Sequence, residues 1–246
     1  MYLTIVIPCY NEERNLRLGA LEKVSNFLKK KNYSWNVLIV DDGSKDESKR
    51  LIKEFIADNP GFRLLENSHQ GKALTVISGM LSTEGDFILF TDLDQATPIS
   101  EIDNLLPFTK KGYDVVIGSR NNKRRGAPLL RLAMARGFML LRNLILDLKI
   151  KDTQCGFKLF SKKTAHDVLK KISIYKGRHE VSGATVTAGF DVEVLYVAQK
   201  LGYKIQEVPV EWHYQETRRI NPLKDSLQGF KDLLNIRLNS IKGIYD

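Results

Sequence analysis

The chain has 246 residues, a mass of 28.1 kDa and a net charge of +9; 43% of its residues are hydrophobic and 27% are charged. These proportions are those of an ordinary globular protein, and they exclude a disordered, collagen-like or coiled-coil chain. Cys9 and Cys155 are too few for a disulfide framework, so we expect a reducing compartment. The first residues do not resemble a signal peptide, and no apolar run is long enough to span a membrane, so we expect neither secretion nor a transmembrane helix.

The positive charge is concentrated in one part of the sequence. Residues 110–178 hold 18 basic and 4 acidic residues, a net +14, whereas the rest of the chain holds 20 basic and 25 acidic residues. Such a block suits an anionic partner. Nucleic acid, an acidic lipid surface and a phosphorylated substrate all fit this description, and composition does not choose among them.

Short apolar runs alternate with amphipathic stretches through residue 119. The expected strands are 3–8, 35–40, 62–67, 86–92 and 114–119, and the expected helices are 15–30, a segment from Leu51 that is stopped at Asn59-Pro60-Gly61, and 72–81. Because the strands are continuous rather than alternating apolar runs, they indicate a mostly parallel sheet that is covered by helices on both faces. The fold class is therefore α/β.

The pattern changes after Arg120. We expect a loop over 120–128, a helix over 129–148, a glycine-bearing turn and short strand over 152–160, a helix over 191–201 and a last strand over 203–214. The tail from residue 222 predicts an amphipathic helix. Its apolar stripe consists of Leu223, Leu227, Phe230, Leu234, Leu238, Ile241 and Tyr245. We interpret 1–221 as one domain and 222–246 as a C-terminal helix that contacts a membrane surface or packs on the domain.

Polar residues follow the expected strands. Tyr10 and Glu12 follow the first strand, Asp41 and Asp42 end the second, and Arg120 follows the strand over 114–119. Ligands of open parallel sheets bind beyond the carboxyl ends of the strands, so these residues predict a binding site there. For a single residue such as Asp42, a turn or helix-capping role explains the position equally well.

Asp92 and Asp94 form an Asp-x-Asp pair directly after an apolar strand. Two carboxylates this close repel each other unless a cation lies between them, and hard oxygen ligands suit Mg²⁺ or Mn²⁺. Such an ion would bridge a substrate diphosphate and neutralise charge on a leaving group. The sequence contains no glycine-rich phosphate-binding motif that could take this role instead.

Several blocks, taken in order, resemble the inverting glycosyltransferases of family 2, which have the Rossmann-like GT-A fold. They are TIVIPCYNEERNL, LIVDDGSKDES, Gly71-Lys72, FTDLDQATP, VIGSR, DTQCGFKLF, FDVEVLYVAQKLGY and EVPVEW. The resemblance covers nearly the whole chain. Within the family, DTQCGFKLF, FDVE and QGFKDLLNIRL are most similar to the polyprenyl-phosphate sugar transferases, and among these to the dolichyl-phosphate glucosyltransferases.

This resemblance implies roles for individual residues. Asp41 would accept a hydrogen bond from uracil, Asp42 would support the turn, and Asp92 and Asp94 would hold ribose and metal. The nucleotide-sugar site would consist of Pro8, Tyr10, Glu12, Asp41, Asp42, Lys72, Asp92 and Gln95. The sequence departs from its relatives after the second aspartate, where the glucosyl enzymes tend to have Gly and the mannosyl enzymes place a metal-binding Gln one position later than Gln95.

Arginines are candidates for the acceptor phosphate because the guanidinium fork matches its oxygens. These are Arg120, Arg131 and Arg136, although a solvated helix face also explains the last two. Asp152, Thr153, Gln154 and Gly156 would line the sugar pocket. Asp191 fits a helix cap, a sugar-hydroxyl ligand or a general base. Together with Asp94 and Arg120, it is one of three catalytic candidates. Arg218 and Arg219 would belong to a basic loop over the donor, and the four histidines read as surface or structural residues.

The favoured function is transfer of a hexose, glucose first, from a UDP-sugar to a dolichyl- or undecaprenyl-type polyprenyl phosphate, with inversion and with Mg²⁺ or Mn²⁺. The enzyme would be cytoplasmic and peripheral, on the cytoplasmic face of an anionic membrane. Two alternatives remain within the family: a GDP-mannose donor, and a soluble glycan acceptor. A nucleic-acid-binding module would leave the acidic strand ends unexplained, so we expect no nucleic-acid partner.

Overall fold

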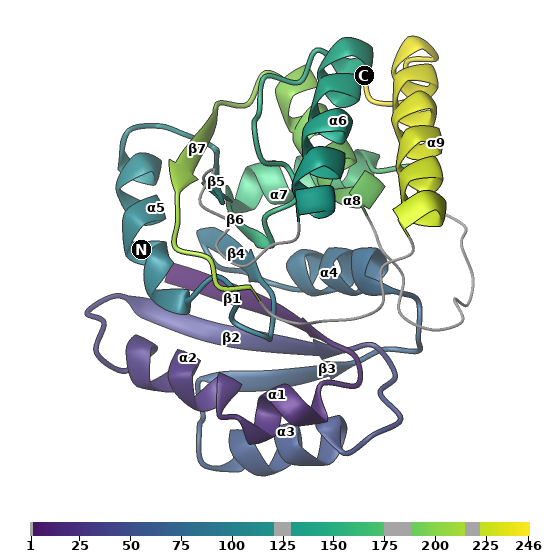
Figure 1. Ribbon diagram of the computed structural model, residues 1–246. Coiled ribbons are helices and arrows are strands. Elements are labelled where there is room, and N and C mark those ends of the chain that lie inside the picture. Colours follow the sequence, from purple (N-terminus) through teal and green to yellow (C-terminus); the bar gives the residue numbers. More distant parts are fainter. Residues whose placement is uncertain (1, 121–128, 175–187, 215–221) are drawn as a thin grey trace.

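The structure is a computed structural model that describes residues 2–120, 129–174, 188–214 and 222–246. In these residues one sheet has the strand order β3-β2-β1-β4-β6-β5-β7 (Figure 1). The strands are β1 (Tyr2–Cys9), β2 (Ser34–Asp41), β3 (Phe62–Glu66), β4 (Phe87–Thr91), β5 (Val115–Ser119), β6 (Phe157–Ser161) and β7 (Ile205–Pro209). The helices are α1 (Glu13–Arg17), α2 (Ala20–Leu28), α3 (Ser48–Ala57), α4 (Lys72–Leu81), the 3₁₀ turn η1 (Ile99–Glu101), α5 (Ile102–Lys110), α6 (Leu129–Leu146), α7 (Lys162–Lys171), α8 (Ala188–Lys200) and α9 (Pro222–Ile241).

The sheet is mostly parallel, as the sequence predicted. β1 pairs in parallel with β2 and β4, so that Cys9 lies opposite Asp41, and β2 with β3 and β5 with β7 are also parallel. The carboxyl ends of these strands therefore meet at one edge. This edge carries the polar residues that follow β1, β2 and β4.

One strand, β6, runs against the others. It pairs antiparallel with both β4 and β5, and the register sets Phe90 opposite Lys158 and Thr91 opposite Phe157. β6 therefore begins at the same edge at which β4 ends. The turn over 152–156, which precedes β6, is carried directly beside the Asp-x-Asp pair.

The two faces of the sheet bury separate cores because successive strand residues point to opposite sides. Leu3, Ile5 and Ile7 of β1 pack with α1, α2, α3 and α5. Val6, on the opposite face, belongs to the core that is formed with α4, α6, α7, α8 and α9 (Figure 1). This confirms the prediction of a sheet covered by helices on both faces.

Three helical segments differ from the expectation. The helix expected over 15–30 is divided into α1 and α2 at Gly19, whose φ of 76° lies in the left-handed region that glycine tolerates. α5 and α7 were not anticipated. α5 contains Pro107, and α7 begins after Ser161, whose hydroxyl accepts a hydrogen bond from the amide of Thr164.

The C-terminal helix α9 lies beside α6 (Figure 1). It buries Leu233 and Ile236 in the core, and Tyr245 beyond its end is fully buried. Two glycines allow close approach: a Cβ on Gly229 would lie 3.0 Å from Phe138, and a Cβ on Gly189 would lie 2.4 Å from Asp232. In the described part of the chain, no helix is both long and apolar enough to cross a membrane.

Candidate active site

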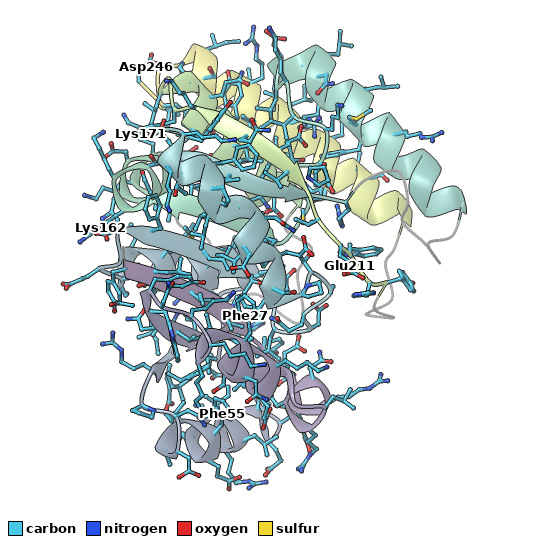
Figure 2. All side chains as sticks on the ribbon, turned by 90° about the vertical axis from the view of Figure 1, so that its left-hand side faces the viewer. Phe27, Phe55, Lys162, Lys171, Glu211 and Asp246 are labelled. Carbon is cyan, nitrogen blue, oxygen red and sulfur yellow. The ribbon has the colours of Figure 1, made fainter. Side chains whose placement is uncertain are left out.

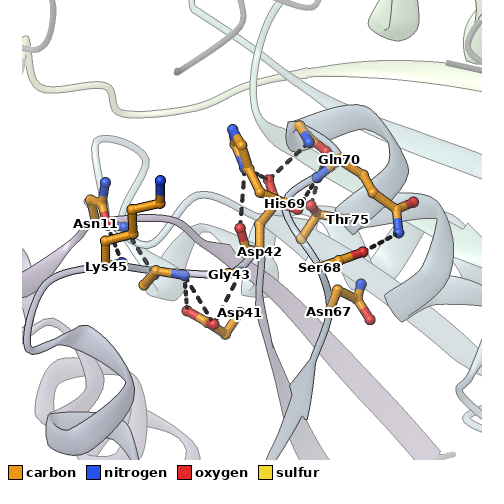
Figure 3. A network of polar contacts seen from close by, with 12 residues as sticks. Asn11, Asp41, Asp42, Gly43, Lys45, Asn67, Ser68, His69, Gln70 and Thr75 are labelled. Carbon is orange, nitrogen blue, oxygen red and sulfur yellow. Dashed lines mark hydrogen bonds and ion pairs between the residues drawn. The ribbon is translucent and has the colours of Figure 1, made fainter. Parts of the chain in front are cut away.

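Two buried aspartates organise the end of β2 (Figure 3). The carboxylate of Asp41 accepts hydrogen bonds from the amides of Gly43 (3.1 Å) and Ser44 (3.2 Å) in its own turn. Asp42 reaches the segment after β3, where it accepts from the amides of Gln70 (2.8 Å) and Gly71 (2.9 Å). Asp41 thus shapes the turn, while Asp42 fixes the segment that leads into α4.

An aromatic pair lies beside these aspartates. The rings of Tyr10 and His69 are stacked with centroids 4.0 Å apart and an angle of 10° between their planes. The Nδ1 atom of His69 lies 2.8 Å from a carboxylate oxygen of Asp42 (Figure 3). Sequence reasoning read His69 as surface or structural; its position just after β3, at the edge where the strands end, was the signal for a place in the site.

Pro8 and Glu12 flank Tyr10. Pro8 is half-buried near the end of β1. Glu12 precedes α1, and its Oε2 accepts a hydrogen bond from the side chain of Asn15 at 2.5 Å, while its amide donates to Ser48 Oγ. Five of the residues predicted for the nucleotide sugar thus lie at the ends of β1 and β2: Pro8, Tyr10, Glu12, Asp41 and Asp42.

Lys72 is the first residue of α4, and its ammonium lies 2.5 Å from Oδ1 of Asp92. Burial opposes the charge of this lysine, but the carboxylates of Asp92 and Asp191 outweigh it and raise the pKa of Lys72. Asp94 accepts a hydrogen bond from the amide of Ala96 at 3.0 Å. The Asp-x-Asp pair therefore presents one carboxylate in an ion pair and another that stabilises the following turn.

Gln95 shapes that turn rather than extending from it. The φ of Gln95 is +51°. Its side-chain Nε2 atom donates to the carbonyl of Asp92 at 3.0 Å, and its Oε1 atom accepts from the backbone amide of Ile99 at 3.1 Å. Both ends of the side chain are thus engaged within the loop after β4.

Gly156 packs against the first aspartate of the pair. A Cβ at this position would lie 2.1 Å from Oδ2 of Asp92, so only glycine fits without displacing the carboxylate. This contact joins the turn over 152–156 to the end of β4. It brings a segment expected to line the sugar pocket against a residue expected to hold the donor.

Arg120 and Asp152 form a two-pronged ion pair. Nε and Nη2 of Arg120 each lie 2.8 Å from a carboxylate oxygen of Asp152, and the amide of Arg120 donates to the same carboxylate. Burial opposes the charge of Arg120, but Asp152 outweighs it and raises the pKa of the guanidinium. The guanidinium also lies 5.6 Å from the ring centre of Trp212.

Asp191 stands in the first turn of α8, where its Oδ1 lies 2.5 Å from the ammonium of Lys158. Lys158 is buried and also donates to the carbonyl of Cys155 at 2.6 Å. Sequence reasoning missed Lys158. The signal was a lysine inside the otherwise apolar strand FKLF, where a buried charge requires a partner.

The remaining residues of the turn are tied to α6. The hydroxyl of Thr153 accepts a hydrogen bond from Nη1 of buried Arg142 at 3.0 Å. Arg142 also donates to the carbonyl of Ile150, and burial lowers its pKa. The backbone amide of Gln154 donates to Oδ1 of Asp152.

Four of the predicted arginines are not found among the described side chains at this edge. Arg136 is exposed on α6. The side chain of Arg131 and both Arg218 and Arg219 lie outside the described residues. Their predicted roles stay predictions.

The edge offers few ligands to a divalent cation. No group of three or more His, Cys, Asp or Glu side chains within the described ranges could enclose an ion. Mg²⁺ is nevertheless usually held by one or two carboxylates together with substrate phosphates. Asp92 and Asp94, two carboxylates at one strand end, fit that arrangement if the Lys72 contact opens.

Comparison with known proteins identifies the family. Residues 4–169 match the model described as Glycosyl transferase family 2. The chain belongs to glycosyltransferase family 2. It is 32% identical to the dolichyl-phosphate beta-glucosyltransferase of Dictyostelium discoideum, over 100% of this chain and 76% of the relative. It is 34% identical to the corresponding protein of Saccharomyces cerevisiae, over 100% and 77%.

Solved structures show the same fold. Glucosyl-3-phosphoglycerate synthase from Mycobacterium tuberculosis, in complex with UDP, superposes with a TM-score of 0.66 at 17% identity and covers 96% of this chain and 80% of its own. The same enzyme with Mn²⁺, UDP and glucosyl-3-phosphoglycerate gives a TM-score of 0.65 at 16% identity, over 96% and 79%. The predicted GT-A fold and the prediction of a glycosyltransferase are thus confirmed.

Proposed function

We propose that this family 2 enzyme transfers glucose from UDP-glucose to a dolichyl-type polyprenyl phosphate, with inversion at the anomeric carbon. The relatives named dolichyl-phosphate beta-glucosyltransferase match the chain over its full length, which supports glucose as the sugar and dolichyl phosphate as the acceptor. The observation that carries the proposal is the meeting of Asp92, Lys72 and Gly156 at the edge that Arg120 and Asp152 also border. Donor-binding and acceptor-binding groups would then face one another.

The donor would bind at the ends of β1, β2 and β4. Tyr10 and Asp41 would contact the uracil, and Lys72 would leave Asp92 to meet the diphosphate. Mg²⁺ or Mn²⁺, held by Asp94 with Asp92, would neutralise the diphosphate of the leaving group. Opening the Lys72–Asp92 pair would thus release a cation for the diphosphate and a carboxylate for the metal.

The acceptor phosphate would meet Arg120. Its Nε and Nη2 atoms already hold Asp152, so the Nη1 amino group is the part of the fork that would reach the phosphate. Arg131 and Arg136 on α6 would add positive charge along the approach of the lipid. The carboxylate of Asp152 would hold the guanidinium in one orientation before the acceptor arrives.

The reaction requires no strong general base. A phosphate monoester has a second pKa of about 6, so the attacking oxygen is largely deprotonated at neutral pH. Catalysis would rest on positioning and on charge stabilisation. Because Asp191 is paired with Lys158, we propose that it accepts a hydrogen bond from a sugar hydroxyl and does not remove a proton.

The lipid acceptor would locate the reaction at a membrane surface, on the cytoplasmic face. Cys9 and Cys155 are free and buried, which fits a reducing compartment. We propose that residues 222–246 are the segment nearest the lipid. We propose no nucleic-acid partner.

The test is transfer of radiolabelled glucose from UDP-glucose to dolichyl phosphate in detergent, with the product resolved as a lipid. Parallel reactions with GDP-mannose, and with a soluble glycan or 3-phosphoglycerate as acceptor, separate the alternatives. Glucolipid formation that requires UDP-glucose and a divalent cation, and that is lost in Asp94→Ala, is expected. Preferred use of GDP-mannose or of a soluble acceptor would overturn the assignment.

A further inference from the structure

Exposed apolar side chains gather at one end of the molecule. Among the described residues, large hydrophobic side chains are strongly exposed at ten positions, and nine of these lie on α6, on α9 or in the tail that follows α9. Leu18 is the exception. The nine are Leu140, Leu141, Leu144, Leu227, Phe230, Leu234, Leu238, Ile241 and Ile244. Large exposed apolar groups that cluster in this way mark an interaction surface.

The exposure follows from how α9 packs. At 100° per residue, buried Leu233 and Ile236 lie on one side of the helix, and Leu227, Leu234 and Leu238 lie on the other. Packing against α6 and α8 therefore uses one face of α9 and leaves a second apolar face without a partner within the described chain. We call Leu227, Phe230, Leu234, Leu238 and Ile241 the α9 stripe.

α6 carries a similar exposed set. Leu140 and Leu144, one turn apart, are 66% and 83% exposed, while Arg142 and Leu146 on the other side are buried. α6 and α9 stand next to each other (Figure 1), and Phe138 of α6 packs on Gly229 of α9. Both helices thus expose leucines at the same end of the molecule.

The exposed charges beside these leucines are mostly basic, and the acidic exceptions, Asp147 and Asp246, lie at the ends of the two segments. From residue 136 to 146 and from 226 to 242, the exposed charged side chains are all basic: Arg136, Lys231, Arg237 and Lys242. Asp232, the acidic residue within these spans, is buried against α8. On the helical projection, Lys231 and Arg237 flank the α9 stripe on opposite sides. An apolar stripe bordered by Lys and Arg is the pattern of helices that lie in the headgroup region of anionic bilayers.

We propose that α6 and α9 together form a surface that docks on an anionic bilayer, with the exposed leucines of both helices inserted among the lipids. This inference deepens the proposed function, since it names how the enzyme reaches a lipid acceptor. A second copy of the chain is the less favoured occupant, because the basic residues that border the stripe would face one another across a dimer of chains that each carry +9.

The position of α6 gives this docking a consequence for the site. Arg142, on the buried side of α6, donates to Thr153 in the turn that also carries Asp152 and Gly156. The helix that lies on the bilayer is therefore bonded to the turn that orients Arg120.

The experiment measures flotation of the full chain with vesicles of phosphatidylcholine, with and without phosphatidylserine. The variants are Leu234→Ser/Leu238→Ser on α9 and Leu140→Ser/Leu144→Ser on α6. Leu18→Ser is the matched control, because Leu18 is 62% exposed but lies away from both helices. We expect each double variant to lose roughly tenfold or more in vesicle affinity, the control to float like the wild type, and Lys231→Gln/Arg237→Gln to lose the preference for phosphatidylserine. Circular dichroism and light scattering report the fold and the oligomeric state.

Unchanged flotation of either leucine double variant would overturn the proposal. A dimeric wild type that becomes monomeric in Leu234→Ser/Leu238→Ser would overturn it as well. A water-soluble short-chain polyprenyl phosphate separates this result from the proposed function. We expect the variants to glucosylate it at the wild-type rate in the absence of vesicles. If the wild type floats but glucosylates no polyprenyl phosphate, the proposed function fails and the docking surface stands.

Discussion

The ammonium of Lys72 and the Oδ1 atom of Asp92 lie 2.5 Å apart, so a lysine at the start of α4 neutralises the first carboxylate of the Asp-x-Asp pair. In the proposed reaction both groups have other partners, the diphosphate and the metal. The pair keeps the two charges matched until the donor arrives.

Replacing Lys72 by Met should therefore separate metal binding from catalysis. We expect kcat/KM for UDP-glucose to fall roughly 100-fold, because one preorganised charge at the leaving group is lost. Mn²⁺ alone should bind more tightly to the variant, since Asp92 no longer has a competing cation, and calorimetry measures this. Lys163→Met, which breaks an exposed ion pair with Asp167, is the control that should change neither quantity. Weaker Mn²⁺ binding to Lys72→Met would contradict this account.

Gly156→Ala should damage the site more than the fold. The new methyl group would lie 2.1 Å from Oδ2 of Asp92, so the carboxylate must move. We expect at least a tenfold loss of UDP affinity or turnover, on the order of 1.4 kcal/mol. The control is Gly137→Ala, because a Cβ there meets nothing within 4 Å and alanine favours the helix by about 1 kcal/mol. Equal activity of the two variants would rule out close packing at Gly156.

The Arg120–Asp152 pair predicts a loss of both stability and acceptor binding. Asp152→Ala leaves a buried guanidinium without its carboxylate, which should cost about 3 kcal/mol of unfolding free energy. Arg120→Lys keeps the charge but not the fork, so we expect KM for the polyprenyl phosphate to rise roughly tenfold while the affinity for UDP is unchanged. Denaturant unfolding and initial-rate kinetics measure the two effects. A change in UDP affinity with an unchanged acceptor KM would reverse the assignment of Arg120.

Glu193 predicts a pH dependence of stability that is opposite to that of most carboxylates. Burial raises the pKa of Glu193 above its ordinary value of 4.5, despite hydrogen bonds from Tyr245 and Ser173. The folded state therefore holds a proton more tightly than the unfolded chain, and the resulting stability is present at low pH and is lost as pH rises through the folded-state pKa. In Glu193→Gln this loss should be absent, so the variant should gain stability relative to the wild type as pH rises from 4 to 8. Thermal unfolding across this range checks it, and a constant difference would contradict it.

Local sequence patterns, that is apolar periodicity and turn residues, predicted most of the helices and strands. The helix over 72–81 is found at the predicted bounds, because an apolar stripe follows Gly71 and ends before a polar turn. Gly19 divides α1 from α2 through its left-handed φ, which an amphipathic pattern does not reveal. The antiparallel course of β6 depends on pairing with β4 and β5, far away in the sequence, and no local pattern carries it.

The residues of the site likewise fall into those that local sequence patterns predicted and those that depend on distant pairing. Strand-end positions led directly to Asp41, Asp92 and Arg120, because the ends of parallel strands share one edge. The partners that hold these residues were not predictable. Lys158 meets Asp191 only because β6 runs antiparallel to β4, and His69 meets Tyr10 only because the segment after β3 folds back on β1.

The reversed strand β6 also constrains how the protein folds. β4 and β5 are not bonded directly to each other; each pairs with β6, whose residues follow β5 by almost forty positions. A ribosome-bound chain that ends before β6 can pair β1 with β2 and β4, and β2 with β3, but β5 has no place in that sheet. Closure of the sheet therefore waits for long-range contacts, which slow folding. Until then β4 presents an unpaired apolar edge, so we expect the truncated chain, rather than the finished one, to require protection from aggregation.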